Sequence, residues 1–105
     1  MSRITTHILD ISRGNPVAGV EIILYRQTAD AWQAIARGYT NPDGRIAEGW
    51  TADPGIYRLR FEVKTYQGAA SFYPFIEVSF EVTANPHYHI PLLLSPFGYS
   101  TYRGS

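Results

Sequence analysis

Apolar and polar side chains alternate along several short stretches of this 105-residue chain, and the alternation constrains the fold more than any other feature. In residues 57–63 every second side chain is large and apolar, and those between are charged. Residues 20–25 and 76–83 repeat the pattern. Because successive side chains of a β-strand point to opposite faces, a period of two is typical of strands with one buried face.

Turn-forming residues end the strands that this alternation predicts. Asn-Pro-Asp-Gly at residues 41–44, Asp-Pro-Gly at 53–55 and Asn-Pro at 85–86 interrupt the apolar pattern, because proline and glycine favour turn geometries. Weaker alternation predicts further strands at residues 4–10, 31–38, 88–95 and 98–103, and only residues 64–71 have the character of a short helix. Seven or eight short strands predict an all-β sandwich or small barrel, as one domain spanning residues 1–105.

The balance of charges and the lack of cysteine exclude several classes of function. Nine basic residues balance nine acidic ones, so no overall positive field recruits nucleic acid or an anionic membrane. Without cysteine there is no thiol nucleophile, disulfide or thiolate metal site. No apolar run approaches the length of a signal peptide or a membrane span. We therefore expect a cytoplasmic protein with neither a nucleic-acid nor a membrane partner.

His7 interrupts the first predicted strand. The inward face of that strand consists of Ile4, Thr6 and Ile8. His7 then lies on the outward face, within reach of a ligand. Asp10 follows three residues later, an odd step, so its carboxylate should point away from His7. A local His-Asp pair is therefore not expected.

The stretch from residue 87 to residue 94 has two contrasting faces. The inward face is wholly apolar and consists of Tyr88, Ile90, Leu92 and Leu94. The opposite face is part polar and part apolar and consists of His87, His89, Pro91 and Leu93. An exposed surface of this kind often marks contact with another chain. We therefore expect an oligomer with this strand at an interface, where a site at His89 could be shared between subunits.

Three interpretations of the histidines compete. His87 and His89 could bind zinc or copper together with His7, because neutral imidazole is a ligand for both metals, although no cysteine or clear carboxylate ligand joins the pair. The histidines could instead be polar residues of an interface. The third interpretation is acid–base catalysis, for which imidazole is suited because it titrates near neutral pH. These residues alone leave all three open.

Arg45 and the C-terminal tail are the remaining candidates. Arg45 follows the turn at residues 41–44, so its guanidinium could grip a carbonyl or enolate from a rigid loop, or be a solvated charge. The tail, residues 99–105, is rich in hydroxyl groups and taken alone could be frayed. Ser105 lacks the Gly-x-Ser-x-Gly context of a hydrolase nucleophile. The chain also has no phosphate-binding glycine loop and no dinucleotide motif.

Three segments together resemble the transthyretin-related 5-hydroxyisourate hydrolases. They are Thr-His-Ile-Leu-Asp at residues 6–10 with Gly-Asn-Pro at 14–16, Thr-Asn-Pro-Asp-Gly-Arg at 40–45, and residues 87–105. The final Tyr-Arg-Gly-Ser is the most specific element, and the resemblance spans the whole chain. It implies a transthyretin-like sandwich of two four-stranded sheets with one short helix. It also implies a homotetramer, a dimer of dimers, with active sites in the channel between dimers.

The resemblance implies a reaction and the residues that perform it. Water would open 5-hydroxyisourate, the unstable product of urate oxidation, to 2-oxo-4-hydroxy-4-carboxy-5-ureidoimidazoline, with no metal and no cofactor. The family's catalytic positions match His7, Arg45 and His89, and its substrate-binding tail matches Tyr102, Arg103, Gly104 and Ser105. His87 is less securely assigned, and the resemblance leaves open which histidine is the general base.

The alternative within this resemblance is transthyretin itself, a carrier of a small hydrophobic ligand. Transthyretin shares the fold and a stretch similar to Leu-Ser-Pro-Phe-Gly-Tyr-Ser-Thr at residues 94–101. The carrier lacks the catalytic histidines and the Tyr-Arg-Gly-Ser ending. Because both features stand in this sequence, we expect a hydrolase.

Overall fold

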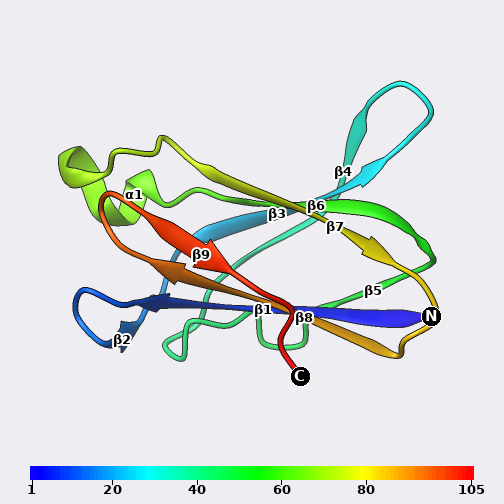
Figure 1. Cartoon of the computed structure of the whole chain (residues 1–105), viewed down its shortest axis with the longest axis horizontal. Coiled ribbons are helices and arrows are strands. Elements are labelled where there is room, and N and C mark those ends of the chain that lie inside the picture. Colours follow the sequence, from blue (N-terminus) through cyan, green and yellow to red (C-terminus); the bar gives the residue numbers. More distant parts are fainter.

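The computed structural model describes all 105 residues and consists of two β-sheets packed face to face, with one short helical segment at one end (Figure 1). Sheet A contains β1 (Ser2–Asp10), β2 (Asn15–Pro16), β5 (Trp50–Ala52), β8 (His87–Leu94) and β9 (Tyr99–Thr101). Sheet B contains β3 (Glu21–Gln27), β4 (Trp32–Tyr39), β6 (Gly55–Phe61) and β7 (Ile76–Val82). The helical segment is α1 (Lys64–Gln67), continued by the 3-10 turn η1 (Gly68–Ala70).

Sheet A is four strand positions wide, although five strands contribute to it. β8 runs parallel to β1, and β9 pairs antiparallel with the far edge of β8. β2 pairs with the last two residues of β1 and β5 with its first three, so these short strands share the remaining edge of β1. Sheet B has the order β4-β3-β6-β7. The expected sandwich of two four-stranded sheets with a short helix is therefore confirmed.

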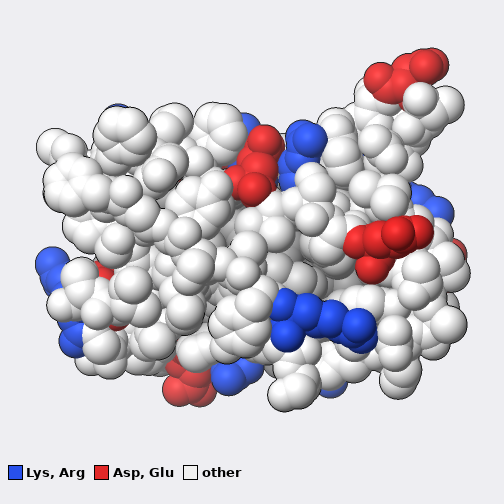
Figure 2. Space-filling view, in the orientation of Figure 1, with Lys and Arg blue, Asp and Glu red and all other residues white.

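Charged side chains lie in small separate groups on the side of the molecule shown in Figure 2. This scatter accords with the equal numbers of basic and acidic residues, nine of each. Neither α1 nor η1 has the length or the apolar character that a helix needs to cross a bilayer.

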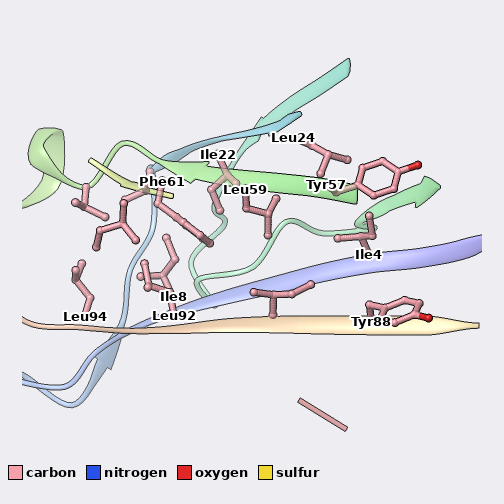
Figure 3. Packing of buried hydrophobic residues seen from close by; sticks show 14 of the residues in the cluster. Ile4, Ile8, Ile22, Leu24, Tyr57, Leu59, Phe61, Tyr88, Leu92 and Leu94 are labelled. Carbon is pink, nitrogen blue, oxygen red and sulfur yellow. The ribbon is translucent and has the colours of Figure 1, made fainter. Parts of the chain in front are cut away.

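The inner faces of the two sheets form one hydrophobic core. Figure 3 shows Ile8 of β1 and Leu92 of β8 on one side of this core, with Ile22, Leu59 and Phe61 on the other. The core cluster contains 17 buried residues. Burying each large apolar side chain stabilises the fold by about 1.5–3 kcal/mol. The inward faces that alternation predicts for β1, β6 and β8 are all buried, which confirms them.

Asp10 points into the sandwich and away from His7, as its odd spacing predicts. The hydroxyls of Ser12 and Tyr66 each donate a hydrogen bond of 2.6 Å to its carboxylate. Burial raises the pKa of Asp10, but these hydrogen bonds outweigh burial and lower the pKa below its ordinary value. The contact from Tyr66 also attaches α1 to the end of β1.

Two features of sheet A differ from the sequence prediction. β2 and β5 were not expected, because pairings of two and three residues are too short to show a period. The outward face of β8 is also less exposed than expected, since Pro91 is buried within one chain. Pro91 lies opposite His7 on β1, and on its other side the Thr101 hydroxyl donates a hydrogen bond of 2.7 Å to its carbonyl.

Candidate active site

The outward face of β1 and β8 carries the polar residues that stand out in the sequence. The parallel pairing of these strands places Arg3 opposite His87 and Thr5 opposite His89. His7 occupies the next outward position of β1, because side chains two residues apart share a face. Strands from the two ends of the chain thus bring all three histidines to one surface, which we call the site face.

A rigid turn brings Arg45 to this surface. The Asn41 side chain accepts hydrogen bonds from the backbone N–H groups of Asp43, at 2.9 Å, and Arg45, at 3.1 Å. Gly44 has a φ of 76°, and a Cβ there would lie 2.5 Å from the carbonyl oxygen of Ile8. The Gly44 carbonyl in turn accepts a hydrogen bond of 2.8 Å from the Ile8 N–H. The turn is therefore attached to β1, where Arg45 forms a β-bridge with His7.

The C-terminal tail is ordered against His89. β9 pairs with β8, and beyond it the Gly104 N–H donates a hydrogen bond of 2.8 Å to the His89 carbonyl. A Cβ on Gly104 would lie 2.5 Å from Cδ2 of the His89 ring. Only glycine therefore allows the tail this close to the imidazole, and the tail in turn limits where the ring can lie.

These elements surround an open pocket of about 300 Å³ on the site face. Its polar lining consists mainly of Arg3 and Thr5 from β1, His87 and His89 from β8, Arg45 from the turn, and Ser105 from the tail. The only apolar residues in the lining are Ile46 and Ala47. The pocket is therefore suited to a small polar ligand that accepts hydrogen bonds.

The structure divides the expected site residues into two groups. Arg45, His89 and Ser105 line the pocket, and His7 lies beside it through its bridge to Arg45. Tyr102 and Arg103 instead line a separate hollow of about 420 Å³ between β7 and the tail. Arg103 lies over the ring of Tyr88 there, with its guanidinium carbon 4.9 Å from the ring centre.

Sequence reasoning missed two residues of the pocket, Arg3 and Thr5. Both occupy outward positions of β1. Alternation does identify these positions as outward, but a threonine or an arginine on the exposed side of a strand is common, so neither residue stood out. Their place in the pocket follows from the register between β1 and β8.

The environment of His7 and His89 favours the neutral form of each ring. Burial lowers the pKa of each ring below its ordinary value, and the positive charge of Arg45 lowers both further. His87 and His7 add to the effect on His89. For His7, a backbone hydrogen bond with Asp43 acts in the opposite direction. Neutral imidazoles have a lone pair, so both histidines are available to accept a proton.

The arginines of the pocket have no acidic partner. No aspartate or glutamate lines the pocket, and neither Arg3 nor Arg45 takes part in any ion pair of the chain. The Nε of Arg3 donates only to the backbone carbonyl of Glu48, at 2.7 Å. The positive charge is therefore available to an electron-rich ligand.

The three histidines do not cluster with one another, or with acidic side chains, in an arrangement that could hold a metal ion. No three side chains of the histidine, cysteine, aspartate or glutamate types are arranged so that they could hold a metal ion. His87 and His89 instead direct one ring nitrogen each toward the hydroxyl of Thr5.

Comparison with known proteins places the chain in a family. Residues 4–104 match the model of the HIUase/Transthyretin family. A probable 5-hydroxyisourate hydrolase of Caenorhabditis elegans is 47% identical, over 97% of this chain and 81% of the relative. The 5-hydroxyisourate hydrolase of Mus musculus is 42% identical, over 99% of this chain and 96% of the relative.

Solved structures agree with the sequence relatives. The Klebsiella pneumoniae 5-hydroxyisourate hydrolase has a TM-score of 0.86 at 38% identity, with 100% of both chains covered. Sea bream transthyretin in complex with thyroxine has a TM-score of 0.89 at 35% identity, with 97% of this chain and 94% of the other covered. This chain therefore belongs to the HIUase/Transthyretin family.

Proposed function

We propose that this protein hydrolyses 5-hydroxyisourate to 2-oxo-4-hydroxy-4-carboxy-5-ureidoimidazoline, a step of urate degradation. The observation that carries the proposal is the convergence of His89, Arg45 and Ser105 on one polar pocket beside His7. Relatives named as 5-hydroxyisourate hydrolases, at 42% to 47% identity over nearly the whole chain, support the same reaction.

The reaction makes two demands that the pocket residues can meet. Water must lose a proton as its oxygen bonds to a ring carbonyl carbon, and the negative charge that develops on the carbonyl oxygen must be stabilised. We assign the first task to a neutral histidine, His89 or His7; general-base catalysis contributes about 10²- to 10⁴-fold. Arg45 performs the second, because its charge is not neutralised by an acidic side chain.

The remaining steps complete the proton balance. The ring C–N bond breaks as the leaving nitrogen takes a proton from the histidine that gained one from the attacking water, or from solvent. The end of the tail binds the substrate in this proposal: Gly104 holds the tail against His89, and Ser105 reaches the pocket. Tyr102 and Arg103 line the separate hollow within one chain, so the structure does not support the substrate contacts expected of them.

The composition of the pocket favours a hydrolase over a carrier. An apolar ligand would face arginine and histidine side chains whose hydrogen-bonding groups it could not satisfy, which is costly. Only Ile46 and Ala47 would offer it apolar contact. Transthyretin in complex with thyroxine shares the sandwich fold, whereas the lining of this pocket favours a polar ligand.

We further propose that the chain acts as a single domain, residues 1–105, in a cytoplasmic homotetramer built as a dimer of dimers. Exposed Phe97 and Tyr99 beside β8, and half-buried Leu9 and Leu93 on the site face, are apolar surfaces that partner subunits would cover. Sedimentation equilibrium should give a mass four times that of the chain, and a monomer at micromolar concentration would contradict the assembly.

The test of the reaction is to generate 5-hydroxyisourate in situ from urate and follow its decay spectroscopically. The uncatalysed rate is subtracted. The protein should accelerate the decay, and product analysis should show the carboxylated imidazoline. Unchanged decay with folded protein, together with tight binding of thyroxine, would establish the carrier function instead.

The histidine assignment is tested by His7→Ala and His89→Ala. Each should lower kcat/KM by about 10²- to 10⁴-fold, as expected when a general acid or base is lost, while the oligomer stays intact. A fully active His89→Ala variant would show that the roles are assigned wrongly.

A further inference from the structure

Thr5 lies between two imidazole rings on the site face. Its hydroxyl oxygen, Oγ1, is 2.7 Å from Nε2 of His87 and 2.8 Å from Nδ1 of His89. A threonine hydroxyl carries one proton. Between two neutral rings it therefore donates to one nitrogen and accepts from the other, which couples the protonation of His89 to that of His87.

The surroundings of His89 favour one of the two possible arrangements. Gly104 packs against the Cδ2 edge of the ring and Thr5 contacts Nδ1, which leaves Nε2 as the ring nitrogen with no partner in the chain. The charged side chains that line the pocket are both arginines. A positive field favours a lone pair over an N–H group at Nε2. His89 then donates from Nδ1 to Thr5, and Thr5 donates to Nε2 of His87.

The geometry points to Thr5 as the positioning residue that holds His89 in the tautomer able to accept a proton at Nε2 and that links His89 to His87. This inference rests on the proposed hydrolysis. When Nε2 of His89 takes a proton from water, the Nδ1 proton moves to Thr5 as the proton of Thr5 moves to Nε2 of His87. One proton enters at His89 and one leaves to solvent from Nδ1 of exposed His87. Because the two transfers occur together, Thr5 stays neutral.

The other groups beside this relay come from three elements. They are Arg3 and His7 on β1, Arg45 on the turn and Ser105 of the tail, and no aspartate or glutamate side chain lines the pocket. Burial and Arg45 lower the pKa of His7, and Asp43 on the same turn acts in the opposite direction. The acidic limb of the pH–rate profile therefore reports the protonation of His7 and His89.

Two variants of Thr5 separate the hydroxyl from the shape of the side chain. Thr5→Val keeps the branched shape and removes the hydroxyl, and should lower kcat about 10- to 100-fold, the effect of removing the partner that orients a histidine. KM should change little. The acidic limb should move to lower pH, because the protonated ring loses its acceptor. Thr5→Ser keeps the hydroxyl and should retain most of the wild-type kcat.

A double-mutant cycle tests whether Thr5 acts through His87. If it does, Thr5→Val combined with His87→Ala should lose no more activity than Thr5→Val alone, because Thr5→Val already breaks the link to His87. Losses that multiply would contradict the link between the two residues. Thermal melting of each variant reports whether the fold is kept.

The tautomer is measured in the free protein, without substrate. A long-range ¹H–¹⁵N NMR spectrum should show His89 protonated at Nδ1 in the wild type and in Thr5→Ser, and a shift toward protonation at Nε2 in Thr5→Val. A wild-type ring protonated at Nε2 would overturn the inference. Because this readout needs no turnover, it decides the role of Thr5 even if 5-hydroxyisourate is not hydrolysed, a result that would reject the proposed function alone.

Discussion

The outer faces of the two sheets carry charge in opposite ways. On sheet B, Arg60 contacts Glu62 at 2.7 Å and Glu77 at 3.8 Å, and Arg58 also contacts Glu77 at 3.8 Å. Arg58 stacks on Trp32, with its guanidinium carbon 4.0 Å from the ring centre. On the site face of sheet A, the arginines and histidines line a pocket without one acidic side chain.

This contrast shows that a chain with no net charge can still have a local surface on which positive groups lack acidic partners. On sheet B both Arg58 and Arg60 have an acidic partner within the chain. On the site face of sheet A, Arg3 donates only to a backbone carbonyl. Burial lowers the pKa of His7 and His89, and the charge of Arg45 lowers both further. An alternating strand surface becomes a candidate site where its charges lack partners within the chain.

Removing one guanidinium from each face is the strongest way to test the contrast. Arg45→Ala should lower kcat/KM by about 10²- to 10³-fold, as when one group that stabilises a developing oxyanion is lost. Arg58→Ala, the matched change on sheet B, should leave kcat/KM within about twofold, because exposed ion pairs contribute little. Steady-state kinetics on freshly generated substrate checks both. Equal losses from the two variants would contradict the distinction between the faces.

A methyl group added to the tail tests the packing around His89. Gly104→Ala would place a Cβ 2.5 Å from the ring, so the ring or the tail must move. We expect kcat/KM to fall about 10- to 100-fold, because small displacements of catalytic groups are costly. Gly98→Ala is the control, since its Cβ would meet only the Ser95 hydroxyl, at 3.7 Å. Full activity of Gly104→Ala would show that the tail does not position His89.

The pH dependence of activity tests the positive field of the site face. Both His7 and His89 have a pKa below the ordinary value, so the acidic limb of kcat/KM should reach its half-maximal point below about pH 6.5. The unfolded chain binds more protons than the folded one between the lowered and the ordinary pKa. Stability should therefore rise with pH across that window and be lost as the pH falls through it. A half-maximal point above about pH 6.5 would contradict the lowered pKa values.

The smallest effect is expected on sheet B. Glu77→Gln removes the shared acidic partner of Arg58 and Arg60. The free energy of unfolding should fall by at most about 1 kcal/mol, because both pairs are partly exposed and screened by solvent. Urea denaturation measures the change, and kcat should not alter. A large loss of activity would mean that the two faces are coupled through the core.

Much of the fold and part of the site could be predicted from the sequence. The outward position of His7 and of His89, and the turn before Arg45, follow from alternation and from Asn-Pro-Asp-Gly. The placement of the tail could not be predicted. Nothing in Tyr-Arg-Gly-Ser indicated that Tyr102 and Arg103 would line the hollow beside β7 while Ser105 lines the histidine pocket. That division depends on where β9 ends and on the close contact of Gly104 with His89.

By itself, the sequence determined which face of β1, β6 and β8 is buried, because side-chain direction depends on the local backbone and repeats every two residues. Only the tertiary structure decided which strands are neighbours, and so which outward side chains lie side by side. The parallel pairing of β1 with β8 joins the two ends of the chain, and only this register puts the Thr5 hydroxyl between His87 and His89. Register between distant strands is set by the packing of the whole core, so no local pattern reveals it.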